Sequence, residues 1–284
     1  MIVGDRRQRI AGMGTRYAML ITAAVVLVLP FVYMVSTSLK SRSLVLEFPP
    51  KLIPDHPTTT NYTDAWGSQN FGRYFLNSTL VAIATTALTV LLAAMMAYGF
   101  ARFDFPGRRA LFAAVVVGLT LPTMALIIPQ FLLARDLKML DKLYGLVPFY
   151  VGTQLAFSTF LLRAFFERLP AELDEAMTID GAGAWRRFWS LAVPLSRPAL
   201  ATCAIFTFLG SWDEFIWALT VINNVANRTL PIGIALFRGQ HSTSWGLIFA
   251  ASIIAIVPVI AVYLTFQRHI VSGLTNGALR GCAW

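Results

Sequence analysis

Two adjacent carboxylates, Asp213 and Glu214, interrupt an otherwise apolar run from Pro198 to Asn227. Acids inside a run of this kind are costly in a bilayer, and they usually face a polar cavity. Trp212 and Trp217 flank the pair, and aromatic faces beside acids suit sugar rings. One interpretation is a polar group lining a ligand path. The alternative is a bend at this point, with a structural role for both acids.

Single amides in three other apolar runs are weaker candidates for the same path, namely Asn77, Gln130 and Gln154. A lone amide in such a run more often makes an interhelical hydrogen bond than a ligand contact. No spacing typical of a metal or redox site relates the cysteines and histidines, which are Cys203, Cys282, His56, His241 and His269. No GxxxxGK[ST] phosphate loop occurs either. We therefore expect no catalytic residue, metal or cofactor in this chain, which favours a protein that is not an enzyme.

The composition predicts a membrane protein. Of the 284 residues 57% are hydrophobic and 13% are charged, with a mean hydropathy of +0.65. Soluble chains carry about a quarter charged residues. The net charge is +9, but the sequence has no basic run with interleaved aromatic residues, so nucleic acid is not an expected partner.

Six apolar runs are long enough to cross a hydrocarbon core, which takes about 20 residues of helix. They span 17–39, 74–101, 110–134, 143–162, 198–227 and 239–267. Prolines within them are tolerated where neighbouring groups satisfy the freed carbonyls. The sequence therefore predicts an all-α protein with six transmembrane helices.

Basic residues predict the orientation of these helices. Arg6, Arg7, Arg9 and Arg16 precede the first run, and the intracellular side of a membrane protein carries the excess of Lys and Arg. We expect a cytoplasmic N-terminus at 1–16, a membrane domain at 17–267 and a cytoplasmic tail at 268–284. The expected location is the inner membrane, as a multi-pass protein.

Residues 163–197 form the longest predicted cytoplasmic segment, and two short helices are expected in it. Pro170 suits the first position of the first helix, and acids in its early turns favour the helix dipole. Gly181, after Asp180, can take the left-handed conformation that ends a helix. The second helix has an aromatic and basic face and is expected to close at Pro194; this face comprises Trp185, Arg186, Arg187, Phe188, Trp189 and Ala192. Such a hairpin could lie in the lipid headgroups or dock on a cytoplasmic partner.

The same segment resembles a known family. Glu175-Ala176-Met177, then Gly181 after three residues, then Leu191-Ala192-Val193-Pro194 after nine more, is similar to the EAA loop of binding-protein-dependent ABC importer permeases. Met177 replaces the second alanine of the pattern, while Leu191 and Val193 are swaps between aliphatic residues. The stretches AYGFARFDFPGRR, SWDEFIWAL and FQRHIVSGLTNGALRG resemble membrane subunits of the maltose-transporter type, and the likeness spans about residues 17–281. Only Cys282, Ala283 and Trp284 extend past the usual end.

The resemblance implies the type I importer architecture and a set of partners. It implies a coupling helix that sits in a groove of an ATP-hydrolysing subunit, with ATP and Mg²⁺ bound there and not here. It also implies a second homologous permease, so a heterodimer, and an extracytoplasmic substrate-binding protein. The expected ATPase contacts are Glu175, Ala176, Met177, Asp180, Gly181, Ala182 and Pro194. A sugar or sugar derivative is the expected cargo.

Three alternatives remain open from the sequence. A glycerol-phosphate-type or polyol substrate would suit a close relative of the same family. A stand-alone secondary transporter predicts an inverted repeat, and none is visible. A membrane-embedded enzyme predicts clustered catalytic groups, which the sequence lacks.

Overall fold

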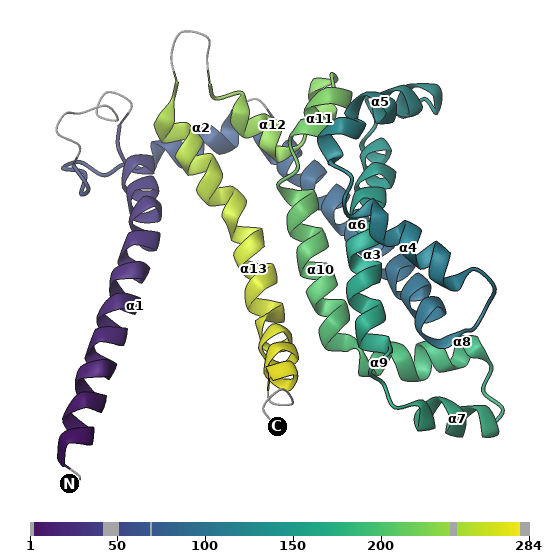
Figure 1. The fold of residues 1–284 in the computed structure, drawn as a ribbon. Helices are drawn as coiled ribbons and strands as arrows, with labels where there is room; N and C mark the ends of the chain where they lie inside the picture. The colour runs from purple at the N-terminus through teal and green to yellow at the C-terminus, as the bar shows by residue number, and fades with distance from the viewer. Residues whose placement is uncertain (1–2, 42–50, 69, 239–242, 279–284) are drawn as a thin grey trace. The chain divides into compact units, whose positions relative to one another are not determined.

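The computed structural model describes residues 3–41, 51–68, 70–238 and 243–278 (Figure 1). Within those ranges, helices are the only regular elements besides one isolated bridge between Arg238 and Thr243. In chain order they are α1 (Val3–Ser38), α2 (Thr60–Gly67), α3 (Phe71–Arg102), α4 (Arg108–Gly118), η2 (Thr123–Leu126), α5 (Ile127–Asp136), α6 (Leu143–Phe166), α7 (Ala171–Ile179), α8 (Ala184–Arg187), η3 (Phe188–Ala192), α9 (Val193–Leu195), α10 (Arg197–Trp212), α11 (Ile216–Val221), η4 (Val225–Asn227), α12 (Leu230–Ala235) and α13 (Trp245–Ala278). The chain forms two compact units, residues 1–69 with 234–254 and residues 70–233 with 255–284, and each is described by itself.

Four helices in the described ranges are long and apolar enough to cross a membrane. They are residues 16–38 of α1, all of α3 and α6, and residues 245–265 of α13. Two further segments qualify only as bent pairs: α4 with η2 and α5 turns by 95°, and residues 184–195 turn by 79° into α10. The described chain therefore has four to six candidate spans. The prediction of an all-α membrane protein is confirmed.

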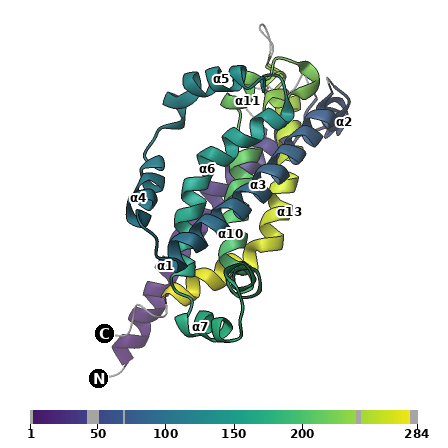
Figure 2. The same ribbon diagram turned by 90° about the vertical axis from the view of Figure 1, so that its right-hand side faces the viewer.

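The predicted third span, 110–134, is not one straight helix. α4 ends at Gly118, and the chain turns at Pro122, whose φ is −69° and ψ 119°. A proline disfavours helical geometry in the residue before it, here Leu121. Figure 2 shows α4 and α5 as two arms of a bent segment beside α6. The sequence prediction treated the prolines of this run as tolerated within one continuous helix, and it therefore missed this break.

The predicted fifth span, 198–227, also breaks, at the acid pair. α10 ends at Trp212, and α11 begins at Ile216 after three intervening residues. The Glu214 carboxylate accepts the backbone N–H groups of Trp217 and Ala218, at 2.7 and 3.0 Å. The first N–H groups of a helix have no partner inside it, so this carboxylate supplies one. The chain thus starts a new helix at the point where the alternative interpretation placed a bend.

The core of the second unit consists of α3, α6 and α10, which run side by side in both views (Figures 1 and 2). Small residues at the contacts let these helices approach closely. They include Ala93, Ala97, Ala199 and Cys203, all buried. α4 packs on α6 through Phe112, which stacks on Phe160 with ring centroids 6.4 Å apart and carries the Arg163 guanidinium 3.7 Å from its own centroid.

In the first unit, Asn61 holds the end of α1. Its amide donates to the carbonyls of Ser38 and Lys40, at 2.8 and 2.7 Å. Tyr62 adds a hydroxyl contact to Ser38 at 2.7 Å. The most apolar 18-residue window of α1 has no buried residue, whereas Ser36, Thr37 and Ser38 at the end of the helix are buried.

Candidate functional site

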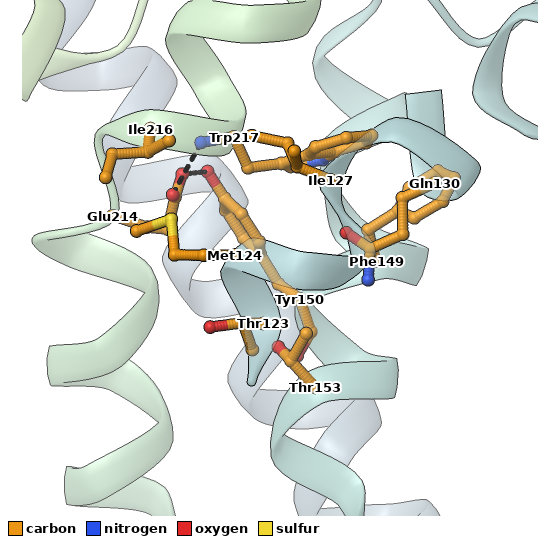
Figure 3. Close-up of a pocket in the computed structure, with 10 residues that line it drawn as sticks. All are labelled: Thr123, Met124, Ile127, Gln130, Phe149, Tyr150, Thr153, Glu214, Ile216 and Trp217. Atoms are coloured by element: carbon orange, nitrogen blue, oxygen red, sulfur yellow. Dashed lines mark hydrogen bonds between the residues drawn. The ribbon is translucent and has the colours of Figure 1, made fainter. Parts of the chain in front are cut away.

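Glu214 lies on the wall of a small cavity formed by η2, α5, α6 and the start of α11. Its carboxylate accepts the Tyr150 hydroxyl at 2.6 Å in addition to the two N–H groups of α11 (Figure 3). Tyr150 is 4% exposed, and the pair joins the middle of α6 to α11. Three donors on one carboxylate hold it in a fixed position, since hydrogen bonds to a charged group are about twice as strong as neutral ones.

The cavity next to this carboxylate has a volume of about 110 Å³. Aromatic faces of Phe149 and Trp217 lie beside polar groups of Gln130 and Thr153 on its wall (Figure 3). The remaining lining residues are Thr123, Met124, Ile127, Tyr150, Glu214 and Ile216. Trp217 is 7% exposed, and its indole Nε1 has no hydrogen-bond partner within the described ranges. A buried donor without a partner is uncommon, and a bound hydroxyl or water would satisfy it.

A second cavity of about 510 Å³ shares Thr123, Gln130, Phe149 and Thr153 with the first. It lies inside the bend between α4 and α5, against α6, and its other walls are mainly aliphatic. The two spaces together offer a mostly apolar wall with a few polar groups, which is the usual make-up of a small-molecule site.

Of the residues predicted for the ligand path, Glu214 and Trp217 line the small cavity, as does the weaker candidate Gln130. Trp212 does not line it; the indole is 2% exposed and donates to the Ala255 carbonyl at 3.1 Å. The Asp213 side chain is exposed and has no hydrogen-bond or ion-pair partner in the described part of the chain.

The remaining two amides have other partners. Asn77 donates to the carbonyls of Ala226 and Arg228, at 3.0 and 2.9 Å, and so holds the η4 loop. Gln154 donates to the Ser211 hydroxyl at 3.0 Å, which joins α6 to α10. The Gln154 contact matches the interhelical alternative that the sequence left open, while Asn77 instead joins α3 to a loop.

Sequence reasoning missed Tyr150 and Thr153 as cavity residues. With Gln154 they place polar groups at i, i+3 and i+4 of an apolar run, a spacing that puts them near one face of a helix. That pattern is visible in the sequence. Thr123, Met124 and Ile127 were not predictable in the same way, because the bend after Gly118 brings them to α6.

The second candidate site is the hairpin of α7 and residues 184–195, here called the coupling hairpin. α7 begins at Ala171, so Pro170 precedes the helix as its N-cap and is not the predicted first residue. Gly181 has a φ of +75°, as predicted for the end of this helix. Gly181 N–H bonds the Thr178 carbonyl and Ala182 N–H bonds the Met177 carbonyl, at 3.0 and 2.9 Å. This pair of bonds is the Schellman motif.

The second arm of the hairpin does not close at Pro194. It continues to Leu195 and turns at Ser196 into α10. Residues 188–192 form a π-helical turn, and Val193 N–H reaches back to the Phe188 carbonyl. In an α-helix the proline ring clashes with the carbonyl four residues earlier, and a wider turn relieves that contact.

The predicted ATPase contacts differ in their exposure. Glu175, Ala176, Asp180 and Gly181 are exposed, Met177 and Pro194 are half-buried, and Ala182 is buried at 7%. Four of the seven residues therefore lie open on the tip of the hairpin. Ala182 instead holds the turn from inside.

α7 is tied to the end of α3 by a nearly buried ion pair. Arg102 Nε lies 3.1 Å from Asp174 Oδ2, with both side chains 14% exposed, and Arg102 also donates to the Leu169 carbonyl at 2.7 Å. Tyr98 packs against Phe188 of the second arm, with ring centroids 5.3 Å apart. Both arms of the coupling hairpin are thus fixed to the C-terminal end of α3.

No group of three or more His, Cys, Asp or Glu side chains in the described part of the chain could hold a metal ion. The cavity at Glu214 and the hairpin are the two candidate sites in the described part of the chain. Long apolar helices with a cavity between them and an exposed hairpin at their end are the features of a membrane transport subunit.

Comparison with known proteins agrees with this class. Residues 89–276 match the family described as "Binding-protein-dependent transport system inner membrane component", and the chain belongs to that family. It is an integral inner-membrane component of an ABC transporter, a permease subunit. It is 38% identical over 266 residues to the diacetylchitobiose uptake system permease protein NgcG of Streptomyces coelicolor, covering 93% of this chain and 88% of that protein.

It is also 36% identical over 264 residues to the sulfoquinovosyl glycerol transport system permease protein SmoH of Agrobacterium fabrum, covering 92% and 93% of the two chains. A chain in the crystal structure of a bacterial ABC transporter for the acidic polysaccharide alginate has the same fold. The TM-score is 0.80 at 24% identity, over 93% of this chain and 98% of that one. The ABC importer permease fold predicted from the sequence is confirmed.

Proposed function

We propose that this chain is one of two permease subunits that carry a sugar or sugar derivative across the inner membrane, driven by ATP hydrolysis on a partner. The observation that carries the proposal is the coupling hairpin, whose exposed Glu175, Ala176 and Gly181 stand on a base fixed by Arg102 and Asp174. Because this contact fixes the hairpin to α3, a movement of the hairpin would be transmitted to α3. ATP and Mg²⁺ would act on the partner, and the chain itself is not an enzyme.

The carbohydrate assignment rests on the relatives and on the cavity. NgcG is named for diacetylchitobiose and SmoH for a sulfoquinovosyl glycerol, and both cargoes contain a sugar. An aromatic wall with an amide and a hydroxyl suits a sugar ring, since its C–H face packs on aromatics and its hydroxyls need donors and acceptors. Both named cargoes favour a sugar over a simple glycerol phosphate or polyol. Family membership favours the ATP-driven importer over a secondary transporter.

The proposed function implies a particular membrane topology and set of partners. Residues 1–16 and the tail 268–284 would be cytoplasmic, residues 17–267 would form the membrane domain, and residues 163–197 would be the coupling loop. The partners would be a dimer of ATP-hydrolysing subunits, a second homologous permease and an extracytoplasmic substrate-binding protein.

Charge reversal on α7 tests the coupling role. Glu175→Lys should abolish ATP-driven uptake in proteoliposomes while the protein still inserts, because it reverses an exposed charge at the proposed ATPase contact. Glu172→Lys is the matched control, since Glu172 is an exposed acid one turn earlier on the same helix. Normal uptake by Glu175→Lys, or equal loss in both variants, would refute the assignment. Co-purification with a P-loop ATPase and a second permease would test the class.

The cavity has its own test. If it lies on the sugar path, Gln130→Leu should raise the KM for uptake, because it removes an amide from the wall of both cavities. Asp213→Asn should leave KM unchanged, because Asp213 does not line either one. An unchanged KM in Gln130→Leu with a raised KM in Asp213→Asn would place the sugar path at Asp213 and overturn the cavity assignment.

A further inference from the structure

A third cavity lies at the junction of α3, the coupling hairpin and α10. Its volume is about 310 Å³, and Thr86 and Trp189 are the two lining side chains that carry a polar atom. The lining residues are Thr86, Ala87, Val90, Leu91, Ala94, Phe188, Trp189, Val193, Leu200 and Ala204. We call this space the junction groove; it shares no lining residue with the cavity at Glu214.

Two arginines lie one helical turn from the groove. Arg186 precedes Trp189 by three residues on the hairpin, and Arg197 precedes Leu200 by three residues on α10. Residues three apart on a helix lie on neighbouring parts of one face. Both arginine side chains are exposed, and neither has an ion-pair or hydrogen-bond partner in the described part of the chain. The neighbouring Arg187, by contrast, donates to Thr178 at 3.0 Å.

The hairpin arm that carries Arg186 runs across the ends of the core helices (Figure 1). Its residues 184–195 are bent by 79° from α10, so beside a spanning α10 they run close to the membrane plane. Trp185 and Trp189 on this arm are 60% and 44% exposed. Tryptophan and arginine on a helix in that plane are typical of the headgroup region.

We propose that the junction groove binds one anionic phospholipid, with an acyl chain in the groove and the phosphate between Arg186 and Arg197. The almost wholly apolar wall suits an acyl chain, and the two arginines one turn away suit a negatively charged headgroup. An anionic lipid places a net negative charge beside these two arginines, which a lipid without net charge or an apolar helix does not.

Native mass spectrometry of the assembled transporter tests the proposal. Phosphatidylglycerol and phosphatidylcholine with identical acyl chains are supplied together at equal concentration. One phosphatidylglycerol should be retained in preference to phosphatidylcholine. The double variant Arg186→Gln/Arg197→Gln should weaken phosphatidylglycerol binding roughly 25-fold, about fivefold for each arginine, and leave phosphatidylcholine binding unchanged.

Two further variants separate charge from shape. Arg109→Gln is the charge control, because Arg109 is exposed and without a partner in the described part of the chain but lies on α4, away from the groove. It should bind phosphatidylglycerol as the wild type does. Ala87→Phe fills the groove without changing charge, and it should weaken both lipids.

Wild-type affinity in the double variant, or equal retention of both lipids, would overturn the proposal. Displacement of the lipid by inorganic phosphate would also overturn it, because the groove would then contribute nothing. Loss of the ATPase subunit from the double variant with phosphatidylglycerol binding intact would assign the arginines to that partner instead. These readouts do not depend on the identity of the transported substrate.

Discussion

The ion pair between Arg102 and Asp174 should determine how firmly the coupling hairpin is fixed, and Asp174→Asn removes it. The substitution keeps the size of the side chain and deletes its charge. It affects the 3.1 Å contact with Arg102 and the 3.4 Å contact from the Tyr98 hydroxyl. Arg102 retains its bond to the Leu169 carbonyl, so the guanidinium is not left entirely without an acceptor.

The size of the effect follows from burial. Exposed ion pairs contribute about 0–1 kcal/mol, and removing one partner of a fully buried pair costs about 3–5 kcal/mol. Both side chains here are 14% exposed, close to the buried case, but Arg102 keeps one acceptor. We expect a loss of about 2 kcal/mol in the free energy that holds α7 against α3. That is about a 30-fold change in the opening equilibrium.

Hydrogen–deuterium exchange measures this equilibrium directly. The amides of Asp180, Gly181 and Ala182 are hydrogen-bonded within the hairpin, so their exchange should be about 30-fold faster in the variant. Asp104→Asn is the control: Asp104 also pairs with an arginine, at 2.7 Å from Arg108, but its side chain is 95% exposed. That substitution should change exchange less than about threefold. Exchange within twofold of wild type in Asp174→Asn would refute the reasoning.

Two other predictions concern the stability of the second unit. Gly233→Ala should lower the unfolding free energy by about 1–3 kcal/mol, because a Cβ there would lie 2.5 Å from the ring of Tyr74, which is 1% exposed. Thermal unfolding in detergent measures this loss of stability. Gly99→Ala is the control, because a Cβ at Gly99 would have open space around it. Equal unfolding midpoints for the two variants would contradict the packing argument. Glu214→Gln should cost about 1–2 kcal/mol, because an uncharged amide is a weaker acceptor for the α11 N–H groups. The control is Glu167→Gln, whose pair with Arg163 is more exposed, and a smaller effect in Glu214→Gln than in this control would rule out the capping role.

The helices and the end of α7 could be predicted from the sequence because their causes are local. A long apolar run must satisfy its own backbone in a bilayer, so it forms a helix whatever surrounds it. Glycine at 181 permits a φ of +75°, and the neighbouring residues already indicate the turn. The EAA-type spacing likewise lies within one segment of the chain, and that spacing is enough to indicate the family.

The breaks in the third and fifth runs were harder to predict. Hydropathy averages over a window, and a window does not distinguish a straight helix from two helices joined at Pro122. At Glu214 the sequence left two interpretations open. The structure gives the acid both a cap on α11 and a place on a cavity wall, because the break itself opens that wall.

The sequence by itself determined the class: an all-helical inner-membrane permease with an EAA-type loop of defined spacing. Composition, apolar runs and one cytoplasmic loop carry that information along the chain. The tertiary structure decided which polar residues share a site. Asn77 and Gln154 have partners within the fold, while Tyr150, Thr153 and Gln130 meet Glu214 at a cavity. Proximity between distant segments depends on how bent helices pack, and no local pattern encodes it.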